Sequence, residues 1–167
     1  MPQQNTEQIL KAAILLERRG KAFYKRVADQ AELPEVRDFF QLMADEEDKH
    51  IEILSNQFKS IQKDDRMAPG DYDNTALVKD TVNILSKNLL AKISAADFEA
   101  AAVSAAMAME QKDIRLYADR AKAAADSEEK ALYSWLAKWE KSHLETLAEI
   151  DRAITEDIWN DNSFWPS

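Results

Sequence analysis

The sequence predicts an all-α protein, built as an antiparallel four-helix bundle with a long crossover between the second and third helices. Glycine and proline occur 2 and 4 times in 167 residues, which favours helices over sheets. Apolar residues recur at every third or fourth position over long stretches, as amphipathic helices require. The two halves of the chain also share a polar pattern at a constant offset, which indicates two copies of one helical hairpin. We expect residues 1–167 to form one domain.

The first hairpin is predicted from two helices joined by a short turn. The first helix is expected over about residues 6–30, where Ile9, Ala13 and Leu16 begin an apolar stripe. The second helix is expected over about residues 34–63, because Pro34 suits the first turn of a helix. The short turn between them implies that the two helices are antiparallel neighbours.

The crossover is predicted over about residues 64–93. It contains Pro69-Gly70 and a cluster of aspartates, which form the clearest break in the chain, and a shorter helix is expected over about residues 75–90. This segment is long enough to cross the length of a bundle. The second and third long helices are therefore able to run parallel.

The second hairpin follows the crossover. Its first helix is expected over about residues 94–125, beginning where Ser94 to Asp97 resembles a capping box. Its second helix is expected over about residues 128–158, with Asp126 and Ser127 as cap residues. The aromatic tail, residues 159–167, is expected to dock on this bundle or on another copy of the chain, and an interface with a partner is the alternative.

Composition excludes several classes of function. The sequence has no cysteine, which excludes disulfides, cysteine-ligated zinc or iron–sulfur centres and thiol catalysis. The formal net charge of −9 argues against binding through nucleic-acid phosphates. The first residues lack a signal-peptide pattern, and no apolar run approaches the roughly 20 residues of a membrane span. We therefore expect a cytoplasmic protein that binds neither nucleic acid nor membrane.

The chain has two histidines, and each follows a glutamate by three residues. The motifs are Glu47-x-x-His50 and Glu140-x-x-His143, whose histidines are 143 − 50 = 93 residues apart. The same offset carries Glu17 onto Glu110. Each hairpin therefore offers one lone glutamate and one Glu-x-x-His pair. Four helices with these side chains match the ligand pattern of dinuclear carboxylate metal sites in bundle cores.

The spacing lets both side chains of a Glu-x-x-His pair face one point in the bundle interior. The predicted roles are bridging for Glu47 and Glu140, terminal for His50 and His143, and outer carboxylate for Glu17 and Glu110. Mixed oxygen and nitrogen ligands suit iron or manganese, and zinc would also bind, so the ligand types alone do not fix the identity of the two metal ions. The alternative is a set of solvated surface charges. The apolar context of Glu17, in the run AILLE, argues against it.

Four runs of sequence carry a resemblance to a known family. The runs LLERRGKAFY and ADEEDKH are similar to the glutamate–tyrosine helix and the Glu-x-x-His helix of the rubrerythrin family, and MEQKDIRLY and WEKSH repeat both features. The resemblance covers roughly residues 7–155. It implies a ferritin-like bundle with a diiron centre. It also implies a non-haem diiron oxidoreductase that reduces hydrogen peroxide or dioxygen through ferrous/ferric cycling.

Two departures from that family bear on function. A full-length rubrerythrin carries a rubredoxin module whose cysteines hold an electron-transfer iron, so a sequence without cysteine is expected to use a separate donor protein such as a rubredoxin. Rubrerythrins also carry an extra glutamate where this chain has Asp113, whose mate in the repeat is Gly20. Asp113 is a candidate further ligand, or a residue that orients a histidine. An ordinary exposed helix charge is the alternative.

Other residues near the motifs are weaker candidates. Tyr24 and Tyr117 each lie seven residues after a lone glutamate, two turns along the same helix face. They are candidates for hydrogen bonds to ligand carboxylates or for electron relay, and plain packing is the alternative. Trp139 directly precedes Glu140 and is expected to point away from it. The acidic run from residue 45 to residue 48 is expected to be solvated apart from Glu47.

Two other classes of function stay open. The same centre would serve a ferroxidase that stores or delivers iron, and storage would need a closed cage of many chains. An inactive structural bundle is the third class, and the intact set of six candidate ligands argues against it because buried charges without a metal cost stability. The expected substrate is hydrogen peroxide or dioxygen. We also expect a homo-oligomer of two or more chains.

Overall fold

The computed structural model describes residues 2–70, 72, 89, 91–93 and 97–160. Four long helices contain most of these residues: α1 (Pro2–Gln30), α2 (Pro34–Asp64), α5 (Asp97–Ala123) and α6 (Ser127–Asn160). The described part of the chain has no β-strand, and the predicted all-α class is confirmed. Within the same residues, no helix is both long enough and apolar enough to cross a lipid bilayer.

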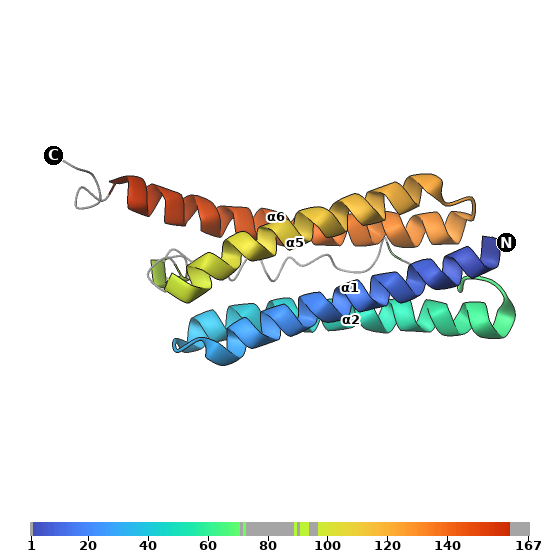
Figure 1. Cartoon of the computed structure of the whole chain (residues 1–167), viewed down its shortest axis with the longest axis horizontal. Coiled ribbons are helices and arrows are strands. Elements are labelled where there is room, and N and C mark those ends of the chain that lie inside the picture. Colours follow the sequence, from blue (N-terminus) through green and yellow to red (C-terminus); the bar gives the residue numbers. More distant parts are fainter. Residues whose placement is uncertain (1, 71, 73–88, 90, 94–96, 161–167) are drawn as a thin grey trace.

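The helices form two antiparallel hairpins that pack face to face (Figure 1). The close backbone contacts are concentrated within the pair α1 and α2 and within the pair α5 and α6. In Figure 1, α2 ends at the end of the bundle where α1 begins, whereas α5 begins at the opposite end, so α2 and α5 run parallel. Two hairpins joined by one long crossover form a ferritin-like bundle, as the sequence predicts.

Local sequence signals account for the helix ends. Pro34 lies in the first turn of α2, where a missing N–H breaks no hydrogen bond of the helix. α2 is capped by Asp65, whose φ of 63° is left-handed and whose N–H donates to the carbonyl of Ile61 at 3.1 Å. Asp126 caps α6, because its carboxylate accepts the N–H of Glu129 at 3.0 Å. The predicted roles of Pro34 and Asp126 are thus confirmed.

Several predicted features fall on residues that are not described. These are the capping box at Ser94, most of the shorter helix expected over residues 75–90, and the tail from residue 161. Leu89 and Ile93, close to the start of α5, are helical and buried against the bundle. The end of the crossover is therefore part of the core.

Two apolar clusters fill the bundle, one toward each end. The first includes Tyr24, Val27, Phe39, Phe40, Met43, Val103, Leu147 and Ile150. The second includes Leu10, Ala13, Leu54, Tyr117, Leu132, Leu136 and Trp139. Each long helix contributes to both clusters, and buried glutamates and histidines lie between the two contributions. We use the name polar layer for six of them: Glu17, Glu47, His50, Glu110, Glu140 and His143.

Candidate metal centre

All six candidate ligands predicted from the sequence lie in the polar layer. Their exposed fractions are 0% or 1%: Glu17, Glu47, His50, Glu110, Glu140 and His143. The pattern of α1 shows why, since its buried positions recur every three or four residues from Ala13 through Glu17 and Gly20 to Tyr24. A glutamate in such a series must point inward. The alternative of solvated surface charges is therefore wrong, and one chain supplies all six side chains.

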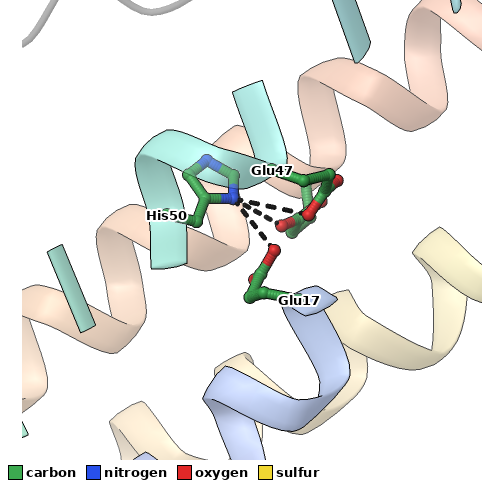
Figure 2. Close-up of side chains that lie close together, drawn as sticks. Glu17, Glu47 and His50 are labelled. Atoms are coloured by element: carbon green, nitrogen blue, oxygen red, sulfur yellow. Dashed lines mark hydrogen bonds and ion pairs between the residues drawn. The ribbon is translucent and has the colours of Figure 1, made fainter. Parts of the chain in front are cut away.

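The first set of side chains gathers around Nδ1 of His50. That nitrogen lies 3.2 Å from Oε2 of Glu17, 3.0 Å from Oε1 of Glu140 and 3.8 Å from Oε2 of Glu47. Figure 2 shows Glu17 and Glu47 directed at this ring nitrogen. Each of the four residues offers one ligand atom, and these atoms all lie within 4.8 Å of one another. One metal ion can span such a set.

The second set gathers around Nδ1 of His143. That nitrogen lies 3.3 Å from Oε1 of Glu47, 3.4 Å from Oε1 of Glu110 and 3.3 Å from Oε2 of Glu140. Ligand atoms of these four residues again lie within 4.8 Å of one another. The rings of His50 and His143 have centroids 6.0 Å apart and are 25° from parallel, so the two sets are neighbours.

Glu47 and Glu140 belong to both sets, and each divides its two oxygens between them. Oε2 of Glu47 and Oε1 of Glu140 face His50, whereas the other oxygen of each faces His143. A carboxylate that presents one oxygen to each of two neighbouring positions has the geometry of a bridge between two cations. This division is what the bridging role predicted for Glu47 and Glu140 requires.

Buried polar atoms without partners provide an independent test of whether metal ions fit. Both oxygens of Glu47 and of Glu140 make no hydrogen bond of good geometry, and the same holds for Oε2 of Glu110 and Nδ1 of His143. Such atoms are rare in folded proteins and cost about 1–3 kcal/mol each. A pair of cations ligated by oxygen and nitrogen would satisfy these atoms together. The residues present therefore fit a dinuclear metal centre.

Protons neutralise part of the polar layer when no metal is bound. Burial alone would raise the pKa of Glu17, but the positive charge of the adjacent histidine lowers it to about 2. Burial alone would also raise the pKa of Glu110, which hydrogen bonds with its neighbours lower. Burial and the charge of Glu17 raise the pKa of Glu47 to about 8, and burial with the charge of Glu110 raises that of Glu140 well above its usual range.

The two histidines carry the opposite charge. Burial alone would lower the pKa of His50, but the charges of Glu17 and Glu140 raise it well above its usual value. Burial would likewise lower the pKa of His143, and hydrogen bonds to neighbouring glutamates raise it. At neutral pH the metal-free layer therefore holds two imidazoliums, two carboxylates and two neutral carboxyl groups. Two divalent cations with four carboxylates and two neutral imidazoles also sum to zero charge.

Tyr24 and Tyr117 link the two hairpins at the outer glutamates. The Tyr24 hydroxyl donates to Oε1 of Glu110 at 2.6 Å, and the Tyr117 hydroxyl donates to Oε1 of Glu17 at 2.6 Å. Each tyrosine therefore contacts the glutamate of the other hairpin. Burial and the charge of these glutamates raise the pKa of both tyrosines well above normal, so the hydroxyls stay protonated donors. In Glu17, this bond leaves Oε2 to face His50.

Asp113 is buried beside the centre, so the alternative of an exposed helix charge is wrong. It belongs to neither set of mutually close ligand atoms. Burial and the charges of Glu110 and Glu17 raise the pKa of Asp113 to about 9, which keeps it protonated at neutral pH without a metal. Its repeat mate Gly20 backs onto Glu47, because a Cβ on Gly20 would lie 3.5 Å from the Glu47 carboxyl carbon. Asp113 stays a candidate ligand.

The sequence prediction is wrong for Glu46 and does not include the contact of Trp139 with His143. The acidic run that contains Glu46 is predicted to be solvated. Glu46 is instead buried, with its carboxylate against Nε2 of His143. Trp139 is buried in the second apolar cluster, as expected of a packing residue, and its indole N–H also points at the same nitrogen at 3.2 Å. Glu46 precedes His50 by four residues, and Trp139 precedes His143 by four. That spacing places each on the histidine face of its helix and is the signal that finds them.

Aromatic rings cover the outer side of His50. Its ring centroid lies 5.7 Å from that of Trp135 and 4.9 Å from that of Trp139, with interplanar angles of 74° and 90°. Tyr72, in the segment after α2, packs on Trp135 at 5.5 Å, and its hydroxyl accepts a hydrogen bond from Gln57 at 3.0 Å. The centre is therefore bounded on this side by aromatic rings.

Metal binding is expected to release protons. Filling both positions must displace protons from two imidazoliums and two carboxyl groups, so we expect about four protons to leave at pH 7. The affinity should rise with pH, because all four groups lose their protons as pH increases. Calorimetric titration with Zn²⁺ in buffers of different ionisation enthalpy measures the number. A release of fewer than about two protons, or an affinity independent of pH, would contradict this description of the layer.

Removing either tyrosine hydroxyl is expected to destabilise the metal-free protein. Tyr24→Phe leaves Oε1 of Glu110 without its donor, and Tyr117→Phe does the same to Glu17. A buried hydrogen bond to a charged group contributes about 1.5–3 kcal/mol, so each variant should lose that much free energy of unfolding. Chemical denaturation of the metal-free variants measures the loss. A change within about 0.5 kcal/mol, typical of surface substitutions, would show that the tyrosines only fill space.

Comparisons with known proteins agree with this arrangement. The family model of rubrerythrin matches residues 8–150, a range that contains all six candidate ligands and both tyrosines. The comparison with curated proteins found no match, and the comparison with solved structures found none. A match over most of the chain, together with the ferritin-like bundle and its buried glutamates and histidines, identifies the family. The chain belongs to the rubrerythrin family.

Proposed function

We propose that this chain is a non-haem diiron oxidoreductase that reduces hydrogen peroxide with electrons from a separate donor protein. The observation that carries the proposal is the pair of buried ligand sets that share Glu47 and Glu140. The four oxygens of these two carboxylates make no hydrogen bond of good geometry in the metal-free protein. Two cations, one in each set, would bind all four.

Iron is the metal proposed for both positions. Carboxylate and imidazole ligands suit iron, manganese and zinc, but zinc has no redox chemistry. Membership of the rubrerythrin family favours iron over manganese. Bound ferrous iron would supply the two electrons that, with two protons, reduce one hydrogen peroxide to two water molecules.

The side chains of the centre have separate tasks in this proposal. Glu47 and Glu140 set the distance between the two positions, since each presents one oxygen to either side. Tyr24 and Tyr117 hold the outer glutamates in place through their hydroxyls. Asp113 is buried beside the centre and stays a candidate further ligand, or a residue that orients a histidine.

The cavities of the described residues favour a small substrate. A cavity of about 640 Å³ lies where α1 meets α2 and includes Leu33 and Phe98, and one of about 390 Å³ lies at the other end of the bundle. Neither is lined by any of the six candidate ligands. A cavity of about 30 Å³ reaches Tyr117, which holds Glu17. Its size suits a water-sized molecule, and none of these three cavities places a large organic substrate against the six candidate ligands.

Anaerobic loading with ferrous iron, followed by stopped-flow mixing with peroxide and separately with dioxygen, tests the proposal. We expect two irons per chain, fast oxidation by peroxide, slow oxidation by dioxygen and re-reduction by reduced rubredoxin. Glu140→Ala removes a bridging carboxylate and should lose both stoichiometric iron binding and turnover. Glu145→Ala, an exposed glutamate on the same helix, is the matched control and should keep both.

Two results would count against this function. Preference for dioxygen with iron uptake well beyond two ions per chain would support the alternative of a ferroxidase that stores or delivers iron. Unchanged iron binding and peroxide turnover in Glu140→Ala would contradict the assignment of the centre itself.

A further inference from the structure

The outer ring nitrogens of the two histidines have different partners. Nε2 of His143 meets the carboxylate of Glu46 from α2 and the indole N–H of Trp139 at 3.2 Å. Nε2 of His50 is also buried, but it makes no hydrogen bond within the described residues. The rings of Trp135 and Trp139 lie against His50 instead, at centroid distances of 5.7 and 4.9 Å.

The difference between the partners of the two histidines arises at one pair of matched positions in the sequence repeat. Glu46 and Trp139 are 139 − 46 = 93 residues apart, the offset that relates the two histidines. The three candidate ligands of one hairpin therefore match those of the other in residue type, whereas the residue that precedes the Glu-x-x-His motif differs. On one hairpin that residue is a glutamate, and on the other it is a tryptophan.

We infer that Glu46 is a positioning residue for His143, and that the metal position at His143 binds more tightly than the position at His50. A histidine that donates its outer N–H to a carboxylate has a fixed tautomer, a fixed ring orientation and a more basic inner nitrogen. Glu46 provides such a carboxylate to His143. Within the described residues, His50 has no equivalent acceptor.

The protonation of Nε2 of His143 decides whether Glu46 or Trp139 forms a hydrogen bond with this nitrogen when metal is bound. Nδ1 of His143 faces the three carboxylates of its set, so Nδ1 binds the metal and the ring hydrogen resides on Nε2. A protonated Nε2 cannot accept a hydrogen bond. Glu46 therefore accepts the Nε2–H, and that nitrogen accepts no hydrogen bond from the indole N–H of Trp139.

Zinc binding to the full chain tests the unequal affinities without any redox chemistry. Competition with a chelator gives both Zn²⁺ affinities for the wild type, Glu46→Ala, Glu46→Gln and Asp45→Ala. Loss of Glu46 should weaken one ion about 10–100-fold and leave the other unchanged. Glu46→Gln should weaken it less, because an amide oxygen still accepts the N–H. Asp45 is exposed on the same turn of α2, so Asp45→Ala should change neither affinity.

Proton NMR of the zinc-loaded protein identifies the histidine concerned. The Nε2–H of His143 should resonate downfield because of its carboxylate partner, and the Nε2–H of His50 should be shifted by the adjacent indole ring. Glu46→Gln should move the His143 signal and leave the His50 signal in place. A structural role alone would not produce this selective shift.

This inference rests on the proposed metal centre and not on the reaction assigned to it. A wild-type protein that binds two Zn²⁺ ions, with both affinities unaffected by Glu46→Ala and Glu46→Gln, would overturn the inference alone. So would equal weakening of both ions, or ligation of His143 through Nε2. A wild-type protein that fails to bind two ions would overturn the proposed centre as well.

Discussion

Four carboxylates buried between two apolar clusters are the constraint on which the rest of this structure depends. A buried carboxylate is too costly unless a proton, a hydrogen-bond donor or a cation compensates it. Each hairpin supplies two of these carboxylates and one histidine. Both sets of ligand atoms are therefore complete only when the two hairpins pack together. The hydrogen bonds from Tyr24 and Tyr117 cross between the hairpins at the same level. Apolar packing on both sides of the layer keeps the two hairpins in register.

The polar layer reaches zero charge in two ways, with protons or with divalent cations. Because burial and mutual repulsion hold protons on Glu47 and Glu140, the side chains converge before any metal arrives. The ligand positions are therefore preformed, which lowers the reorganisation that metal binding requires. The environment outside the ligands is less symmetric than the ligands themselves, since Glu46 faces one histidine and Trp139 packs on the other. A pair of unequal positions follows from a duplicated hairpin whose copies differ at Glu46 and Trp139.

The direction of side chains on one helix and the convergence of the repeated motifs could be predicted from the sequence, whereas the individual partners across helices could not. The inward direction of Glu17 follows from the apolar residues around it, and the helix ends follow from local proline and cap residues. The hydrogen bond from Tyr24 to Glu110 of the other hairpin does not follow from the sequence. Spacing along one helix does not show which residue of a neighbouring helix faces that tyrosine. Glu46 is misassigned when its place in an acidic run outweighs its four-residue spacing to His50, and the contact of Trp139 with His143 is missed for the same reason. The distance from Asp113 to the centre depends on how closely α1 and α5 approach, which the sequence does not encode locally.

Anomalous diffraction from crystals of the iron-loaded protein, recorded on either side of the iron absorption edge, tests the central claim most directly. The account predicts two iron peaks per chain inside the polar layer. One should lie within bonding distance of Nδ1 of His50 and the other within bonding distance of Nδ1 of His143, with Glu47 and Glu140 between them. A single peak, or peaks outside the layer, would contradict the claim that these six side chains form a dinuclear centre.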